Sequence, residues 1–419
     1  MGGRGGTAMN PAPPWVAVAV FVAAYLVMTA RDLRFLPLGR AGGALVGAFL
    51  LVAVQVMTPE EAWAAIEPNT LVLLLGMMVI AAALDIAGFF NRAAVMLLAR
   101  ARTPVALLHL TAWGAGILSA FLVNDTVCLL LTPLLVAAVR RAGLPMIPYL
   151  FALCMGANIG SVATLSGNPQ NMLIGALSGD HYRSFLLDLA PVAIGGLTIL
   201  SGILHASFAR ELRAAGPIQQ GTELPAVQRG LLRRGLIILG LVVVGFFGGA
   251  RLSLSALGGA CAVLVVGGVD ARKVFRRVDW LLLLFFASLF VLVEGVVRAG
   301  AAEWLHSLFQ PLLGEGARRQ AVVFTGLAVL GSNLVSNVPF ILVARPWIGA
   351  LDDPVLQWRV LAMATTFAGN LTLLGSVANL IVIDLAGEDV RIGFWRYLRV
   401  GLPVTVATTA WGLLVLLLL

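Results

Sequence analysis

Apolar runs follow one another along almost the whole chain, and the loops between them carry most of the charged residues. At 1.5 Å per residue, most of these runs can cross, or nearly cross, a hydrocarbon layer about 30 Å thick. Hydrophobic residues make up 60% of the 419 and charged residues only 11%, which excludes a soluble domain of this length. Since backbone groups in lipid must be satisfied within the protein, the sequence predicts an all-α polytopic membrane protein. The runs span residues 14–30, 41–57, 69–89, 104–139, 148–178, 189–209, 234–249, 254–269, 280–298, 320–348, 358–386 and 393–419.

Four of these runs are interrupted by polar residues. In 104–139 the interruption is "VNDT" (Val123–Thr126), and in 320–348 it is "VSNVP" (Val335–Pro339). An apolar run with a polar tip halfway along predicts a re-entrant hairpin, which enters and leaves the membrane by the same face. Runs 148–178 and 358–386 contain "NIGSVATLSGNPQN" and "GNLTLLGSVAN", which are rich in Gly, Asn, Ser and Thr. Because such backbone is tolerated at membrane depth only inside protein or beside a wet cavity, they predict two broken helices.

The distribution of arginine supports this topology. With two hairpins and ten crossings, most basic residues fall on one side, which the positive-inside rule makes cytoplasmic. The exceptions on the other side are Arg251, Arg318 and Arg319, beside the acidic "PEEAW" loop. The net charge of +8 therefore acts as a topology signal of the inner membrane and does not indicate nucleic acid. The basic positions are Arg31, Arg34, Arg40, Arg92, Arg100, Arg102, Arg140, Arg141, those of 210–234 and 270–277, Arg391, Arg396 and Arg399.

The chain contains an internal repeat. Residues 44–88 align without gaps on 256–300, which is a sequence offset of 256 − 44 = 212. The two hairpins align at an offset of 337 − 124 = 213, and the two broken segments at an offset of 379 − 171 = 208. Each repeat then has five crossings and one hairpin, and this odd number of crossings makes the repeats inverted. The predicted organisation is a tail and first crossing at 1–40, the rest of repeat 1 at 41–209, a cytoplasmic linker at 210–233, and repeat 2 at 234–419.

The polar interruptions supply the candidate site. Half-helix N-termini offer N–H groups to an anion, and unwound carbonyls offer oxygens to Na⁺. Isolated small polar residues also serve as contacts between membrane helices, which is the alternative for each of them. The candidate binding residues are Asn124, Asp125, Thr126, Asn158, Thr164, Ser166, Gly167, Asn168, Asn171, Ser336, Asn337, Asn370, Thr372, Gly375, Ser376 and Asn379.

Asp125 is the charged residue at a hairpin tip, and Val338 is its counterpart in the second repeat. A carboxylate at that depth is costly unless it meets a cation or a proton, so Asp125 is a candidate coupling residue. The alternative is an Asp that caps the helix at the hairpin turn. Na⁺ is expected, if it binds, at Asn124, Asp125 and Asn337.

The stretches "FLVNDTVCLLLTP" (Phe121–Pro133), "SNLVSNVPFILVARP" (Ser332–Pro346) and "GNLTLLGSVANLIV" (Gly369–Val382) resemble the ion transporter superfamily. It includes arsenite permeases, Na⁺/H⁺ antiporters, citrate transporters and divalent-anion:sodium symporters, and the arsenite and anion permease branch is the most similar. The resemblance implies a homodimer with a scaffold and a moving transport domain, each hairpin tip facing the unwound stretch of its own repeat. Neither tip carries the Ser-Asn-Thr signature of the dicarboxylate symporters, which argues against that substrate and a two-sodium stoichiometry.

The leading hypothesis is a secondary active permease that moves a small anion or oxyanion, such as arsenite or a carboxylate, by alternating access. The alternative is a Na⁺/H⁺ antiporter of the same fold. An enzyme is not expected, because no paired acids, His cluster or nucleophile with a base is visible in the sequence. No cofactor is expected beyond the coupling ion, Na⁺ or H⁺. No phosphate-binding loop is present, although the resemblance leaves room for a separate ATPase subunit.

Overall fold

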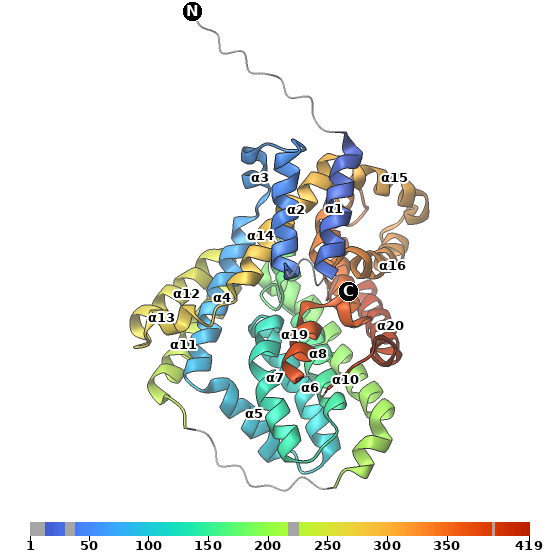
Figure 1. Cartoon of the computed structure of the whole chain (residues 1–419). Helices are drawn as coiled ribbons and strands as arrows, with labels where there is room; N and C mark the ends of the chain where they lie inside the picture. Colours follow the sequence, from blue (N-terminus) through green and yellow to red (C-terminus); the bar gives the residue numbers. More distant parts are fainter. Residues whose placement is uncertain (1–12, 30–37, 217–225, 388–389) are drawn as a thin grey trace, which may run out of the picture.

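The computed structural model describes residues 13–29, 38–216, 226–387 and 390–419, and the described chain is built from helices (Figure 1). The first half contains α1 (Pro14–Thr29), α2 (Gly39–Ala53), α3 (Pro59–Ala65), α4 (Pro68–Ile86), α5 (Phe89–Arg100), α6 (Pro104–Phe121), α7 (Asn124–Arg141), α8 (Met146–Ser161), α9 (Pro169–Ser178) and α10 (Tyr182–Ala214). The second half contains α11 (Arg229–Phe247), α12 (Leu252–Val266), α13 (Ala271–Phe275), α14 (Trp280–Arg298), α15 (Ala301–Leu313), α16 (Ala317–Val335), α17 (Asn337–Ile348), α18 (Pro354–Ala368), the 3₁₀ turn η1 (Leu373–Gly375), α19 (Val377–Ala386) and α20 (Phe394–Leu418).

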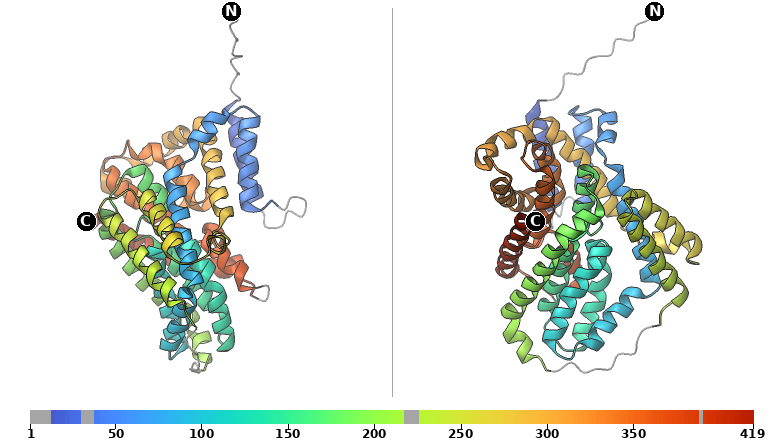
Figure 2. Two further views of the ribbon diagram at one scale, coloured as in Figure 1. Left: turned by 90° about the vertical axis from the view of Figure 1, so that its left-hand side faces the viewer. Right: turned by 180° about the vertical axis from the view of Figure 1, so that it is seen from behind.

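The two halves have the same order of helices, so that α1 to α10 correspond to α11 to α20. In Figure 1, α5 lies at the lower end of the molecule, whereas its counterpart α15 lies at the upper end. Both views of Figure 2 agree with this placement. The repeats are therefore inverted, and the predicted fold class is confirmed.

Six of the described helices are long and apolar enough to cross a membrane, namely α4, α6, α10, α11, α14 and α20, and five shorter helices are also apolar. Helices α6 and α7 fold back on each other at Leu122 and Val123, and α16 and α17 do so at Ser336. These pairs are the two hairpins. The backbone leaves the helix between α8 and α9 and again between α18 and α19, which forms the two broken helices.

Close approach of small residues holds the first hairpin against the first broken helix. A Cβ added to Gly160 of α8 would lie 2.2 Å from the Cα of Gly116 in α6. A Cβ added to Gly156, one turn earlier, would lie 2.5 Å from the carbonyl oxygen of Ala112. Small residues at this spacing let membrane helices approach until their backbones touch. Substitution of either glycine would force α6 and α8 apart.

Each hairpin also packs against the broken helix of the other repeat. Besides its own broken helix, α7 packs against α19 of the other repeat, and α17 likewise packs against α9. The guanidinium of Arg140 in α7 extends this contact by donating to the carbonyl oxygen of Ala386 at 3.2 Å. A separate group of helices, formed by α1, α2, α4, α11, α12 and α14, packs together beside this core.

Helices α5 and α15 connect that group to the hairpins, and the apolar runs did not predict them. Both are amphipathic, with few buried residues, so they form no continuous apolar run. Each starts after a glycine in the left-handed conformation, Gly88 with φ +87° and Gly300 with φ +78°. Gly88 and Gly300 are 300 − 88 = 212 residues apart, which is the offset at which residues 44–88 align on 256–300.

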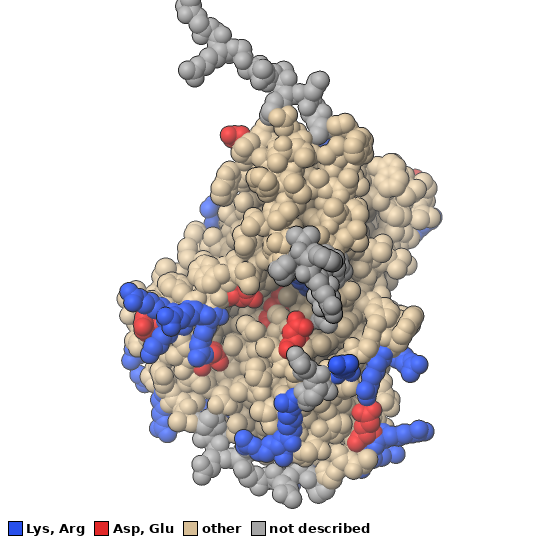
Figure 3. Space-filling model, in the orientation of Figure 1, with Lys and Arg blue, Asp and Glu red and all other residues tan. Residues whose placement is uncertain are grey.

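Charged residues gather at the ends of the helices. Figure 3 shows Lys and Arg over the lower half of one face, whereas the upper part is nearly free of charge. Helix α10 continues to Ala214 and α11 begins at Arg229, so both extend into the linker predicted at 210–233. Charged side chains end an apolar run but do not end a helix that leaves the membrane. Glu211 and Arg396, for example, form an ion pair at 3.3 Å between α10 and α20.

Candidate functional site

Both hairpin tips and both breaks meet at one small cavity of about 30 Å³. This volume accommodates a water molecule or a bare cation, because one water needs roughly 10–15 Å³ on this measure. The cavity is lined by Asn124 and Asp125 of the first tip, Ser336, Asn337 and Val338 of the second tip, Pro169 and Gln170 of α9, Gly375, Ser376 and Val377 before and in α19, and the apolar Phe285, Phe286 and Leu289 of α14.

An asparagine amide holds each break open. The Nδ2 of Asn171 donates to the carbonyl oxygens of Ser161 and Thr164 at 3.3 and 3.0 Å. The Nδ2 of Asn379 donates to those of Gly369 and Thr372 at 2.7 and 3.2 Å. Each donor and acceptor of the second break follows its counterpart in the first break by the same number of residues, since 369 − 161, 372 − 164 and 379 − 171 are all 208. The two repeats therefore use one device, which supplies donors to carbonyls that have lost their helical partners.

The sequence around the first break explains its geometry. A Cβ added to Gly167 would lie 2.2 Å from the carbonyl oxygen of Ser161, so only glycine fits there. Asn168 caps α9, because its Oδ1 accepts the backbone N–H of Asn171 at 2.8 Å. Pro169 occupies the first helical position, where a missing N–H costs nothing. The backbone N–H of Asn124 donates to the carbonyl oxygen of Gly167 at 2.9 Å, which joins the first tip to this break.

Asn158 connects the two repeats. Its Oδ1 accepts from the amide of Asn124 at 3.0 Å and from the hydroxyl of Ser376 at 3.1 Å. Its Nδ2 donates to the Oδ1 atoms of Asn370 at 2.9 Å and Asn379 at 3.1 Å. All five side chains are buried. The amide of Asn158 is thus fully satisfied by protein, which assigns it to the framework of the site.

Three other buried polar atoms near the cavity have no hydrogen-bond partner among the described residues. They are the carbonyl oxygens Oδ1 of Asn124 and Asn337 and the Nδ2 of Asn370. Native proteins rarely leave such atoms unpaired, because each costs about 1–3 kcal/mol. Asn124 and Asn337 both line the cavity. Their oxygens are therefore available to a ligand.

Asp125 is the ionisable side chain among the residues that line the cavity. It is buried, and it shares the cavity wall with Ser376 and Val377 at the start of α19. The counterpart Val338, at 338 − 125 = 213, brings no charge to α9. The two pseudo-equivalent tips thus differ, because only the first carries an ionisable side chain, which lies beside Ser376 and Val377 at the start of α19.

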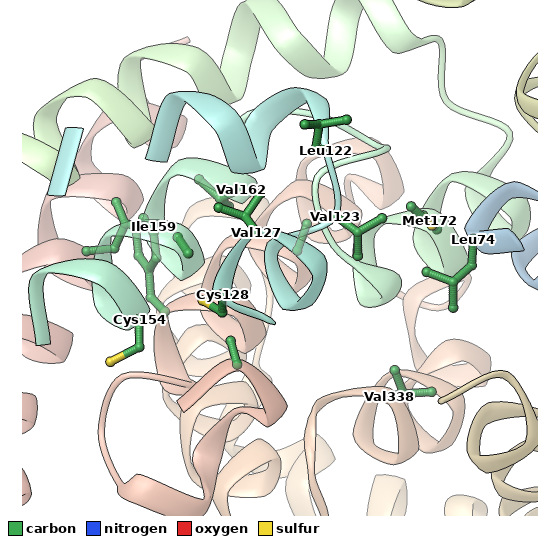
Figure 4. Packing of buried hydrophobic residues seen from close by; sticks show 14 of the residues in the cluster. Leu74, Leu122, Val123, Val127, Cys128, Cys154, Ile159, Val162, Met172 and Val338 are labelled. Atoms are coloured by element: carbon green, nitrogen blue, oxygen red, sulfur yellow. The ribbon is translucent and has the colours of Figure 1, made fainter. Parts of the chain in front are cut away.

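The hairpin tips are anchored differently. Buried apolar residues, among them Leu122, Val123, Val127 and Val162, pack around the first tip (Figure 4). At the second tip Ser336 adopts φ +71° and ψ 161°, which costs a residue other than glycine about 1–3 kcal/mol. Strain of this kind persists where the surrounding structure requires it, and here it lies at the cavity.

A family model described as a citrate transporter, CitMHS, matches residues 23–368 of this chain. The chain belongs to the CitMHS family. It is similar over 95% of its length to the silicon efflux transporter LSI3 of Oryza sativa subsp. japonica, at 29% identity and covering 96% of that protein. An uncharacterized transporter of Mycobacterium tuberculosis is 30% identical, with 94% of this chain and 96% of that protein covered. A Dictyostelium discoideum transporter named arsB is 26% identical, with 97% and 92% covered.

The fold of this CitMHS member is similar to a solved one. The crystal structure of the Alcanivorax borkumensis YdaH transporter, which has an unusual topology, matches with a TM-score of 0.54 at 16% identity. The match covers 97% of this chain and 98% of that one. The CitMHS family falls within the superfamily that the sequence resembles, and the chain is a multi-pass membrane transporter.

Most of the predicted site residues of this CitMHS member come together, in three groups. Asn124, Asp125, Ser336, Asn337, Gly375 and Ser376 line the cavity. Asn158, Asn370 and Asn379 form the amide network, and Thr164, Ser166, Gly167, Asn168 and Asn171 shape the first break. Thr126 differs, because it is half-buried and lies outside the residues that line the cavity.

Sequence reasoning missed Asn333, Thr366 and Gln170, whereas it predicted Thr372, the partner of Asn333. The hydroxyl of Thr372 donates to the Oδ1 of Asn333 at 3.1 Å, and the Nδ2 of Asn333 donates to the carbonyl oxygen of Ala368 at 3.0 Å. Thr366 accepts weakly from the amides of Asn168 and Gln170, at 3.4 and 3.5 Å. A signal for Asn333 existed, since it precedes Asn337 by four residues in "SNLVSN".

Proposed function

We propose that this CitMHS member is a secondary active transporter of the inner membrane, which moves a small oxyacid or oxyanion by alternating access. One cation, Na⁺ or H⁺, drives the transport through Asp125. The observation that carries the proposal is the meeting of both tips and both breaks at one small cavity. That cavity contains a buried carboxyl group beside two amide oxygens without partners.

The cation side of the proposal rests on these oxygens. A carboxylate with two amide carbonyls is the kind of oxygen set that hard cations such as Na⁺ bind, and the cavity has the size of a bare ion. A proton would require Asp125 alone. Because Val338 takes the place of Asp125 in the second repeat, the proposal has one coupling site and not two.

The substrate side rests on the other half of the cavity. Around the start of α9 it offers neutral groups, among them the side chain of Gln170 and the hydroxyl of Ser336. Amides and helix N-termini bind oxygens of acids such as arsenite, silicic acid or a carboxylate. The names of the relatives support this class, since they include a citrate transporter family and a silicon efflux transporter. A cavity of about 30 Å³ is too small for such a substrate, so we take this conformation to be closed around the site.

The proposal is tested with purified protein in proteoliposomes that contain a pH-sensitive dye. Na⁺ is pulsed alone and then with citrate, succinate, sulfate, arsenite or silicic acid in turn. We expect no signal until one of these acids is added. Alkalinisation of the lumen on Na⁺ alone would overturn the proposal and identify the alternative, a Na⁺/H⁺ antiporter of the same fold.

Asp125→Asn tests the coupling role. It preserves the shape of the side chain but removes its charge, so we expect ion-driven transport to fall at least 100-fold. Glu61→Gln is the matched control, because it also removes one negative charge but lies on the exposed helix α3. Transport by Asp125→Asn that still follows the ion gradient would exclude Asp125 as the coupling residue.

The proposal also includes two expectations about partners, a homodimer and the possibility of a separate ATPase subunit. We expect a dimer in detergent by mass measurement. We also expect transport without ATP, and a strict requirement for an added ATPase would contradict secondary active transport.

A further inference from the structure

A second and much larger cavity, of about 570 Å³, lies between the two groups of helices. We call it the vestibule. It is bounded by the start of α4, the end of α9, the turn at Gly179–Tyr182 and the turn at Gly249–Ser253. These segments all lie on the side opposite the basic loops, which makes the vestibule external. Its volume is within the range of about 300–1,000 Å³ that is typical of small-molecule sites.

Arg251 gives the vestibule a charge available to a ligand. It is exposed and forms no ion pair with any residue that the structure describes. Three other polar side chains of the wall, Asn69, Ser253 and Asp180, are engaged with one another or with neighbours, and His181 is exposed beside them. Asn69 accepts from the hydroxyl of Ser253 at 3.0 Å, and Asp180 is paired with Arg359 at 3.4 Å. A small anion would therefore meet Arg251 without first breaking an ion pair.

Tyr182 connects the vestibule to the functional site. Its side chain lines the vestibule but is only 3% exposed. Its hydroxyl lies 3.3 Å from the Oγ of Ser166, which is fully buried in the first break. The ring packs on Phe246 and Phe247 of α11, with centroids 5.1 and 5.4 Å away. Tyr182 follows α9 in sequence but packs on α11, so its ring closes the seam between the two groups of helices.

We propose that the vestibule is the outer binding site of the substrate and that Arg251 attracts a small oxyanion to this site. The ring of Tyr182 is then the barrier between the vestibule and the first break. The substrate in this inference comes from the proposed function. The barrier itself is a statement about accessibility and can be measured without any substrate.

The barrier is tested by labelling of a buried cysteine. The background is Cys261→Ser, because Cys261 is exposed whereas Cys128 and Cys154 are buried. Ser166→Cys is then treated with a membrane-impermeant, negatively charged methanethiosulfonate. We expect slow labelling, at least tenfold faster labelling when Tyr182→Ala removes the ring, and slow labelling with Tyr182→Phe. An unchanged rate in Tyr182→Ala would overturn the barrier.

Substrate passage is tested by blocking the vestibule. In the same background, Ala176→Cys places a thiol at an exposed position of its wall. We expect the same reagent to lower transport at least tenfold, and substrate to slow the labelling. Ser307→Cys on α15, exposed but outside the vestibule, is the matched control. Full transport by labelled Ala176→Cys would show that substrate does not pass through the vestibule.

The role of Arg251 is tested by Arg251→Gln. We expect the KM for the anion to rise at least threefold with little change in kcat, and no change with the control Arg318→Gln on α16. An unchanged KM would remove Arg251 from the proposal. If the wild type transports no oxyacid, the proposed function fails, but the labelling of Ser166→Cys still decides whether Tyr182 is a barrier.

Discussion

Asn158→Ala removes the centre of the amide network and is the most direct test of how the site is held together. The substitution deletes four hydrogen bonds, to Asn124, Ser376, Asn370 and Asn379. It creates no new charge and lies away from the lining of the cavity. The loss should therefore appear in stability and in the order of the first hairpin tip.

The magnitude follows from the number of bonds. A buried hydrogen bond contributes about 1 kcal/mol net, so four of them amount to about 4 kcal/mol. At about 2.1 cal/mol/K per residue, the unfolding entropy of 419 residues is about 0.9 kcal/mol/K. A loss of about 4 kcal/mol then lowers Tm by about 4.5 °C. The partners left unpaired in the core can only add to this loss.

The assay is thermal unfolding of the purified protein in detergent, followed by cation binding. Ser201→Ala is the control, because this buried hydroxyl on α10 has no hydrogen-bond partner among the described residues. It should leave Tm unchanged. Asn158→Ala should also bind the cation more weakly, since Asn124 loses its support. A Tm within 1 °C of the wild type, with unchanged cation binding, would refute the network.

Further predictions concern the backbone and one surface acid. Gly300→Ala should lower the free energy of unfolding by about 1–2 kcal/mol, because φ is +78° and no neighbour lies within 4 Å of the new methyl group. Gly202→Ala, in the middle of α10, should raise it by about 0.5–1 kcal/mol. Thermal unfolding measures both. Ser336→Gly should raise Tm by relieving strain, and a fall in Tm would mean that the hydroxyl outweighs it. The hydrogen bond from the backbone of Thr58, and then Arg298, hold the pKa of Glu61 below its usual value of 4.5. The ionised Glu61 therefore stabilises the fold above that pH, and this stabilisation is lost as pH falls through the lower folded pKa. The difference in Tm between wild type and Glu61→Gln should shrink on acidification, and a constant difference would contradict this assignment.

The sequence predicts the elements of the site better than their contacts. Polar residues in the middle of apolar runs identify both tips and both breaks, because lipid leaves such residues no other place. The sequence predicts Thr126 at the site because it follows Asn124 and Asp125 directly. Consecutive residues of a helix point about 100° apart, however, and α7 turns Thr126 away from the cavity.

Two kinds of feature escaped prediction. Helices α5 and α15 are amphipathic, and a search for apolar runs does not find them. The stretch "SNLVSN" marks Asn333 as a polar residue near the second tip, but its partner Ala368 lies 35 residues away on α18, and no local pattern predicts that contact. The same holds for Tyr182, whose partners lie on α11.

The contact of each hairpin with the broken helix of the other repeat has a consequence for how the chain can be assembled. Helix α7 packs on α19 and α17 on α9, so each repeat alone would expose the surface that its partner covers. A half-chain ending in the linker would therefore be an incomplete body and a target for proteolysis. Two half-chains made together should bind each other through these two contacts. The two repeats should therefore fold as one unit.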